Sequence, residues 1–175
     1  MLRAPARYAG LAVSTTALAV VGTFFAISPA QSDGDRHRDH RDRDRHTELE
    51  ADLNGRNELD ATTLARGAGD PDGDGDAEVD INRRSDTGMV KLCWEIDVDD
   101  IADATRAHIH AGDKRVNGDI VVAFFETDQP QMFEGCTLVE ENLARDIRQH
   151  PREYYVNVHN ADFPGGAVRG QLKRD

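Results

Sequence analysis

Hydrophobic and polar residues alternate along the middle of the chain with a period of two, which is the period of a β-strand. The clearest segment is MVKLCWEIDV (89–98), where one face would hold Val90, Leu92, Trp94, Ile96 and Val98. The opposite face is mostly polar, although it also carries a cysteine. This pattern predicts a strand that covers a core with one face and turns the other face outward.

Three further segments have strand character. DAEVDINR (76–83) alternates in the same way, with Ala77, Val79 and Ile81 on one face. GRNELDATTLARG (55–67) offers a first strand near residues 57–65. IVVAFF (120–125) is apolar on both faces, so we expect it to be buried more completely than the other strands.

One segment has helical spacing instead. In LVEENLARDIRQH (138–150), the apolar residues recur every three to four positions, and Pro151 follows, so we expect a short helix near 138–149. The remaining chain has about seven or eight short strands separated by turn residues, as in β-sandwiches and barrels. The pattern therefore predicts an all-β, antiparallel, Greek-key-like sandwich or barrel with one helix.

The N-terminal region has the organisation of a signal peptide. Arg3 and Arg7 precede the apolar stretch LAVSTTALAVVGTFFAI (11–27), and small residues follow up to Ala30. This predicts a signal peptide over residues 1–30 that is cleaved near Ala30, and therefore a secreted, extracellular protein. An uncleaved signal that anchors the chain in the membrane is the alternative, and we expect no other membrane association.

A charged segment follows the signal. Residues 31–46, QSDGDRHRDHRDRDRH, contain no aliphatic or aromatic side chain, so they have no apolar surface to bury. We therefore interpret residues 31–56 as a disordered charged linker and residues 57–175 as a single β domain.

Acidic residues outnumber Lys and Arg by 33 to 21 in the whole chain, which gives a net charge of −12. Such a surface repels nucleic acid and helps to keep a secreted domain monomeric. We expect an extracellular protein or a surface ligand as its partner.

The chain has two cysteines, Cys93 and Cys136. An oxidising extracellular compartment favours a disulfide between them. Because Cys93 lies on the outward face of its strand, this bridge would pin the loop containing Gly135 onto the outer surface. Two free thiols are the alternative.

Two strings carry a family resemblance, AHIHAG (107–112) and YYVNVHNADFPGGAVRGQL (154–172). Together with WEIDV (94–98) and VNGDIVVAFF (116–125), they resemble the CHRD domain, a module named after the developmental protein chordin. The resemblance covers roughly residues 57–173 and implies the antiparallel β fold of a bacterial secreted protein. Chordin's growth-factor antagonism belongs to a multidomain animal protein and is not carried over.

The same two strings contain the candidate metal ligands. A period of two places His108 and His110 on one side of a strand, and it places His159 beside Asn157 on one side of another. Neutral imidazole suits copper or zinc, so three converging histidines would form a transition-metal site.

Three further polar residues would support these histidines. They are Asn157, Arg169 and Gln171. Alternate positions in 155–159 and 167–171 can share one face of neighbouring strands. The alternative is that the histidines and these groups form a hydrogen-bonded structural network without a metal.

A second candidate ion site lies in GDPDGDGDAEVD (69–80). Its acidic residues are Asp70, Asp72, Asp74 and Asp76. The first half resembles an EF-hand calcium loop, but the twelfth position is Ile81 instead of a bidentate glutamate. The segment is therefore either a weak calcium site or a solvated turn rich in Asp and Gly.

These observations favour a secreted extracellular CHRD-type module that binds a ligand or serves a structural role and has no catalytic activity. A second hypothesis is a copper- or zinc-binding protein, or a metal-dependent oxidoreductase, that uses the three histidines. A third is a calcium-responsive surface or adhesion protein centred on residues 70–76.

Overall fold

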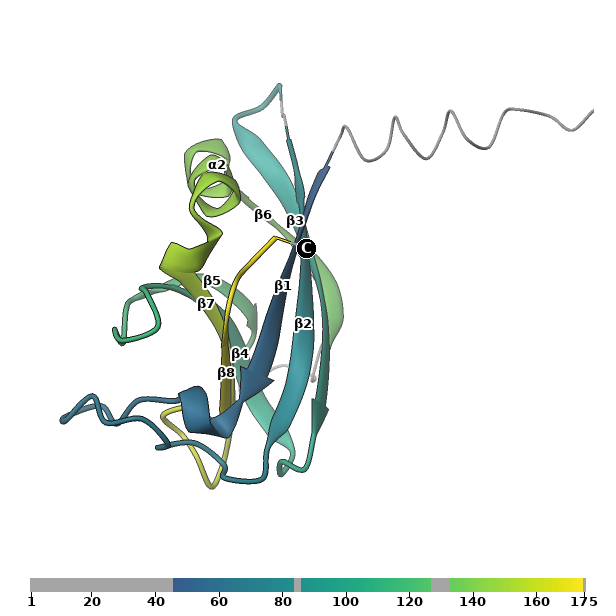
Figure 1. Ribbon diagram of the computed structural model, residues 1–175. Coiled ribbons are helices and arrows are strands. Elements are labelled where there is room, and N and C mark those ends of the chain that lie inside the picture. The colour runs from purple at the N-terminus through teal and green to yellow at the C-terminus, as the bar shows by residue number, and fades with distance from the viewer. Residues whose placement is uncertain (1–45, 84–85, 127–132, 175) are drawn as a thin grey trace, which may run out of the picture. The chain divides into compact units, whose positions relative to one another are not determined.

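The computed structural model describes residues 46–83, 86–126 and 133–174 (Figure 1). These residues form eight strands, one α-helix and two short 3-10 helices. The strands are β1 (His46–Asn54), β2 (Asp74–Asn82), β3 (Met89–Asp99), β4 (Ala104–Ala111), β5 (Ile120–Phe125), β6 (Glu134–Glu140), β7 (Tyr154–Asn160) and β8 (Val168–Gln171). The helices are η1 (Gly55–Asn57), α2 (Glu141–Gln149) and η2 (Pro151–Glu153).

All neighbouring strands are antiparallel and form one sheet with the order β5-β4-β7-β8-β1-β2-β3-β6. The two ends of the sheet approach each other. Trp94 of β3 stacks on Phe124 of β5 with ring centroids 4.7 Å apart, and Phe125 of β5 contacts Phe133, the residue before β6, edge to face with ring centroids 5.9 Å apart. The sheet is therefore a nearly closed barrel, and the prediction of an all-β antiparallel fold with one helix is confirmed.

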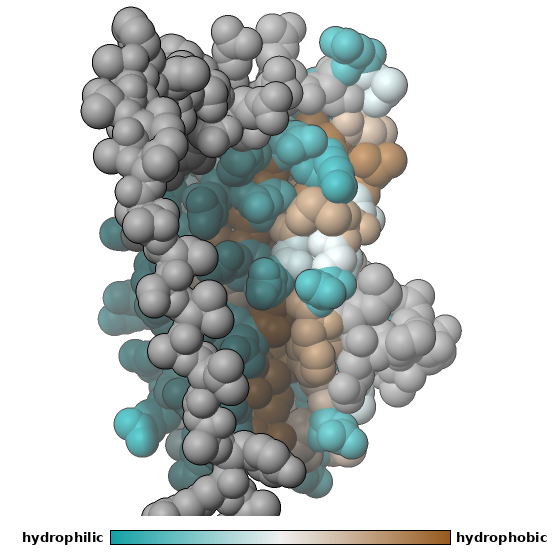
Figure 2. Space-filling view, turned by 90° about the vertical axis from the view of Figure 1, so that its right-hand side faces the viewer, coloured by the Kyte–Doolittle hydropathy of each residue, from teal (hydrophilic) through white to brown (hydrophobic). Residues whose placement is uncertain are grey.

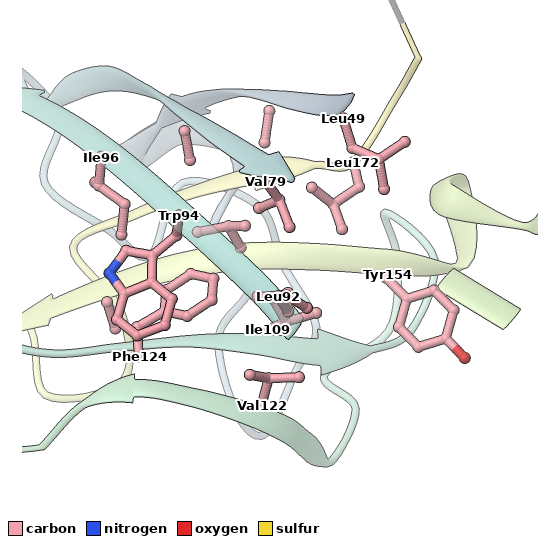
Figure 3. Close-up of a cluster of buried hydrophobic side chains, with 14 of the residues drawn as sticks. Leu49, Val79, Leu92, Trp94, Ile96, Ile109, Val122, Phe124, Tyr154 and Leu172 are labelled. Carbon is pink, nitrogen blue, oxygen red and sulfur yellow. The ribbon is translucent and has the colours of Figure 1, made fainter. Parts of the chain in front are cut away.

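The core lies on the inner face of this sheet. In β2 and β3 the predicted alternation is confirmed, because Ala77, Val79 and Ile81 are buried while their neighbours in β2 are exposed. Figure 3 shows the apolar side chains from several strands gathered in this core, with Trp94 beside Phe124. Burying one large aliphatic side chain stabilises a fold by about 1.5–3 kcal/mol, so this inner layer holds the sheet closed.

The first strand differs from the expectation. Strand β1 occupies residues 46–54, which were expected to be linker, and it pairs with β2 along its whole length. In HTELEADLN, Leu49, Ala51 and Leu53 are buried and alternate with acidic residues, so this segment does bury an apolar face. The part of the predicted 31–56 linker that the structure describes, residues 46–56, is therefore not a disordered linker, and the domain begins earlier than residue 57.

The segment expected to form the first strand, 57–65, is mostly turn. The Asp60 carboxylate accepts hydrogen bonds from the backbone amides of Thr62 and Thr63, which satisfies these donors locally and replaces strand pairing. Only the single bridge between Leu59 and Arg66 has β character there.

Two smaller expectations also need correction. The helix begins at Glu141, because residues 138–140 still belong to β6, where they pair with β3. In α2, Ala144 and Ile147 pack into the core. IVVAFF forms β5 at one end of the sheet, so Ile120 is 51% exposed and the segment is not fully buried.

The cysteines form a disulfide, as expected, but in a different setting. Cys93 of β3 and Cys136 lie directly opposite each other in the β3–β6 pairing and are bonded. Cys136 thus belongs to a strand instead of a loop. Because Leu92 and Trp94 point into the core, the bridge lies on the outer face of the sheet.

The outer face of β1, β2 and β3 is strongly acidic. Cross-strand register places Glu78 between Glu50 and Glu95, and it places Asp76 between Asp52 and Asp97. The space-filling view in Figure 2 shows hydrophilic residues side by side along one part of the surface, next to a band of more hydrophobic residues. This face carries a regular array of carboxylates of the same charge.

The predicted signal peptide and residues 31–45 lie outside the described residues. Within the described part of the chain, no helix is long and apolar enough to cross a membrane.

Candidate metal centre

The three candidate histidines lie on the outer face of the barrel, on the neighbouring strands β4 and β7. In β4, Ala107 and Ile109 point into the core, so His108 and His110 point away from it. In β7 the core residues are Val156 and Val158, which turns His159 outward as well. The period of two therefore places all three imidazoles on one face.

These outward-facing histidines are nevertheless buried. His108 is 1%, His110 9% and His159 6% exposed. The loop between β4 and β5 covers His110, and the turn between β7 and β8 covers His159, as their hydrogen bonds to Gly118 and Pro164 show. Every residue of β7 is buried for the same reason, since the core covers one face and these loops cover the other.

The histidines converge. One ring nitrogen from each lies within 4.8 Å of the corresponding nitrogens of the other two. The closest pair is Nδ1 of His108 and Nε2 of His159, which are 3.3 Å apart. The register explains this contact, because Arg106 lies opposite His159 and places it diagonally next to His108.

In two of the three imidazole rings, a hydrogen bond to a backbone carbonyl determines which nitrogen carries the hydrogen. Nδ1 of His110 donates to the Gly118 carbonyl at 2.8 Å, and Nδ1 of His159 donates to the Pro164 carbonyl at 3.1 Å. A carbonyl oxygen only accepts, so each Nδ1 carries the hydrogen. In the neutral rings Nε2 therefore carries a lone pair.

His108 is held by a carboxylate. Its Nε2 lies 2.9 Å from Oε1 of Glu126, which accepts the hydrogen of this nitrogen. Nδ1 of the neutral ring is then the lone-pair nitrogen, and it is the atom that faces His159. All three histidines thus donate outward, to Glu126, Gly118 and Pro164, and keep one lone pair each for the interior of the cluster. Histidines that bind metals are oriented in this way.

Burial keeps these rings neutral. Desolvation lowers the pKa of His108 and of His110, and together with the neighbouring His108 and Arg106 it lowers the pKa of His159 to about 4. Neutral imidazole is the form that binds a metal ion. At neutral pH the cluster therefore needs to lose no proton before it binds an ion.

The geometry fits a small transition-metal ion. A zinc–imidazole bond is about 2.0–2.1 Å, so two ligands of a tetrahedral ion lie about 3.3 Å apart. The pair formed by His108 and His159 already has this separation, and the widest separation in the cluster must shorten by about 1.5 Å. Three nitrogen ligands without cysteine or methionine suit zinc or copper(II).

Nε2 of His110 is a buried nitrogen without a hydrogen-bond partner of normal geometry among the residues that the structure describes, although the Asn157 side chain, whose Oδ1 is likewise unpaired, raises the pKa of His110 as a hydrogen bond would. An unpaired buried polar atom costs free energy, and a bound ion would satisfy it.

The three expected supporting residues lie on the same face but have different tasks. Asn157 lies opposite His108 and donates from Nδ2 to Glu58 at 3.3 Å. Arg169 lies opposite Asn157 and donates to Asn117 and to the carbonyls of Asp113 and Val116, so it holds the β4–β5 loop. Gln171 donates to the carbonyls of Gly112, Arg152 and Tyr154, and its hydrogen bonds in the described chain do not reach a histidine.

Sequence reasoning missed Glu126, Tyr155 and Glu58. Tyr155 is adjacent to His110, with ring centroids 4.8 Å apart and planes 6° from parallel, and the Arg169 guanidinium lies 3.3 Å from the centre of the same ring. Its position two residues before Asn157 was a usable signal, because both share the face of His159. Glu58 and Glu126 lie outside the motifs, and no spacing rule points to them.

Glu58 is a carboxyl that is only 3% exposed. Burial raises its pKa to about 7, and the nearby Arg169 opposes this shift. Gly166 adopts a φ of 138°, and a β-carbon there would lie 2.3 Å from the Glu58 carboxylate, so glycine is required for this contact. Glu58 thus connects the chain before β2 to the β7–β8 turn and to Asn157.

The structure does not bring the four aspartates of the candidate calcium loop as close together as the histidines, although Asp70, Asp72 and Asp74 line one polar pocket with Asp100. Asp70 accepts from the Asp72 amide within a turn, and Asp74 and Asp76 lie on the exposed face of β2. Across the described ranges, the histidine cluster is the one set of three or more His, Cys, Asp or Glu side chains close enough to share an ion. Calcium binding stays a prediction.

Comparison with known proteins identifies the family. A scan against protein-family models matches the CHRD domain over residues 49–172, which includes every strand from the middle of β1 to the end of β8. No curated protein and no solved structure gave a significant match. The matched region contains all three histidines, and family membership indicates an extracellular binding or structural module. The chain belongs to the CHRD domain family.

Proposed function

We propose that this protein is a secreted CHRD-domain binding module that holds one copper or zinc ion between His108, His110 and His159. The observation that carries the proposal is the direction of the ring hydrogens. Each histidine donates to an acceptor outside the cluster, so the other nitrogen of each ring keeps its lone pair, and one ring nitrogen of each histidine lies within 4.8 Å of the other two. A purely structural network would instead be expected to join the rings to one another through donor–acceptor pairs.

Binding without catalytic turnover is the role that the burial supports. The three histidines are at most 9% exposed and are covered by the β4–β5 loop and the β7–β8 turn. A substrate would have to displace these segments to reach the ion, whereas a bare metal ion needs only a small opening. A catalytic metal site keeps an accessible coordination position, which this arrangement does not favour.

Secretion is supported by two features. The first 30 residues have the composition of a signal peptide, and the Cys93–Cys136 disulfide is typical of an oxidising compartment. N-terminal sequencing of the protein recovered from culture medium tests this part of the proposal. A mature chain that begins near residue 31 is the expected result, whereas retention of residues 1–30 in the membrane fraction would contradict it.

Elemental analysis of the full chain, produced without a histidine tag, tests metal binding. We expect one equivalent of copper or zinc per chain after incubation with the metal and gel filtration, and loss of that equivalent in His110→Ala. The other four histidines of the sequence, His37, His40, His46 and His150, are not among the proposed ligands, so a variant with alanine at these four positions is the matched control and must keep the metal. Circular dichroism shows whether both variants fold.

Two results would contradict the proposal. One is a folded wild-type protein that takes up no copper or zinc. The other is uptake that persists in His110→Ala but disappears in the four-histidine control, because that would place the metal on histidines other than the proposed ligands.

A further inference from the structure

A second candidate site lies beside the β4–β5 loop, around the end of β8. It is a cavity of about 660 Å³, and none of the three clustered histidines lines it. Six of its lining residues are basic: Arg66, Lys114, Arg115, Arg152, Arg169 and Lys173. Its acidic lining residues are Asp52 and Asp113, in a protein whose net charge is −12. Positive charge is therefore concentrated here against the overall balance of the chain.

The acidic residues of the cavity are already engaged. Asp52 pairs with Lys173 at 2.8 Å, and the Asp113 carboxylate accepts from the backbone amide of Arg115 at 2.8 Å. Within the described ranges, no ion pair neutralises Arg66, Lys114 or Arg115. The same holds for Arg152. The positive charge of these side chains is thus available to a ligand.

Arg169 forms a fixed wall of this cavity. Its side chain is 2% exposed, it donates to Asn117 and to two carbonyls of the β4–β5 loop, and it lies over the ring of Tyr155. These contacts position the loop that carries Lys114 and Arg115. The two flexible bases therefore stand on a rigid support, which reduces the ordering that a bound ligand must impose.

We propose that this cavity binds an extracellular ligand carrying two or more phosphate, sulfate or carboxylate groups. Guanidinium groups match such oxyanions with paired hydrogen bonds, and several bases around one cavity raise the local concentration of anions. The volume suits a small organic molecule, since ligand cavities measure about 300–1,000 Å³, and a single inorganic anion would fill only a small part of it. This proposal does not depend on the metal centre.

Calorimetric titration of the full chain at low ionic strength tests the proposal with three probes. Tripolyphosphate, sucrose octasulfate and citrate represent the phosphate, sulfate and carboxylate sources. The protein is first freed of metal by dialysis against a chelator, so that extraction of an ion by the probe gives no heat. We expect saturable binding of at least one probe with one site per chain, and the probe that binds most tightly identifies the chemical source.

The variant Lys114→Ala/Arg115→Ala should bind that probe about tenfold more weakly, because it removes two charge-assisted contacts. Both side chains lie on an exposed loop, so the fold should persist. The matched control Lys91→Ala/Arg145→Ala removes the same charge away from the cavity and should bind like the wild type. Equal weakening in both variants, no effect of either, or no saturable binding of any probe would overturn the proposal.

Discussion

Nδ1 of His108 lies 3.3 Å from Nε2 of His159, and both atoms carry lone pairs once their rings have donated to Glu126 and Pro164. Two buried lone pairs at this distance leave each nitrogen without a donor, unless a proton or a cation lies between them. Burial lowers the pKa of both rings, which disfavours the proton. A metal ion satisfies the same two nitrogens and, in addition, the unpaired Nε2 of His110.

Substitution of Glu126 should weaken metal binding. Its carboxylate accepts a hydrogen bond from Nε2 of His108. This contact raises the basicity of Nδ1 of the same ring, which makes Nδ1 a stronger metal ligand. Glu126→Gln keeps an acceptor of similar size but removes the charge, so we expect the affinity for zinc to fall by about tenfold or more. Competition against a chromophoric chelator measures this change.

Asp119→Asn provides the control for that substitution. Asp119 is exposed in the loop between β4 and β5, and its backbone carbonyl accepts a hydrogen bond from the Ala111 amide. Its substitution removes the same charge without touching a histidine, and the affinity should stay unchanged. If both variants lose affinity equally, general electrostatic attraction explains the effect and the specific role of Glu126 is refuted.

Glu58 should make the protein less stable as the pH rises. Its pKa is raised from 4.5 to about 7 in the folded protein, so the unfolded chain loses this proton first. The free energy of unfolding should fall between pH 4.5 and pH 7 and then level off, with an upper limit of about 3 kcal/mol. Glu58→Gln keeps the size and removes the titration.

Urea denaturation of both proteins at pH 5 and pH 8 measures this effect. The wild type should lose more stability than Glu58→Gln between the two values. A difference of the opposite sign would mean that the Glu58 carboxylate is stabilised as an anion by Arg169 and Asn157.

The disulfide should contribute to stability without controlling the metal centre. Cys93→Ser/Cys136→Ser opens a loop for which the chain-entropy relation gives about 4 kcal/mol. The two cysteines join β3 and β6, and neither strand carries a clustered histidine. We expect a lower melting temperature and unchanged metal stoichiometry. Loss of the metal in a variant that is still folded would show that closure of the barrel positions the histidines.

Salt should stabilise the protein through the acidic outer face. Like charges opposite each other across strands are destabilising, and Glu78 lies between Glu50 and Glu95. Burial and the neighbouring carboxylates raise the pKa of Glu78. Glu78→Gln should raise the stability by about 0.5 kcal/mol at low salt.

The gain from Glu78→Gln should shrink in concentrated sodium chloride, where charges are screened. Asp162→Asn, in the exposed β7–β8 turn, is the control and should show a smaller effect at either salt concentration. Melting temperatures that do not depend on salt in any of the three proteins would contradict this explanation.

Alternation along the chain predicted β2, β3 and the shared face of the histidines, because a strand with one face on a core leaves a period of two in its sequence. The same rule was available for β1, whose Leu49, Ala51 and Leu53 alternate with acidic residues. The linker was incorrectly extended over β1 because the charged segment 31–46, which has no apolar side chains, precedes it. Residues 57–65 failed for a different reason, since the local hydrogen bonds of Asp60 compete with strand pairing.

The candidate site was predicted only in part. Motif spacing nominated His108, His110, His159 and Asn157, but it could not show that loops would bury an outward face of the barrel. The acceptors that orient the rings are Glu126 and two backbone carbonyls, and backbone carbonyls have no sequence signature. The partial exposure of β5 could not be predicted either. It follows from the position of β5 at one end of the strand order, which is a property of the whole sheet.

X-ray absorption spectroscopy at the metal edge of the copper- or zinc-loaded full chain tests the central claim most directly. Three imidazole nitrogens at about 2.0–2.1 Å from the ion are expected, and His110→Ala should abolish loading. A spectrum of the wild type dominated by oxygen ligands, or by one imidazole, would contradict a metal site built from His108, His110 and His159.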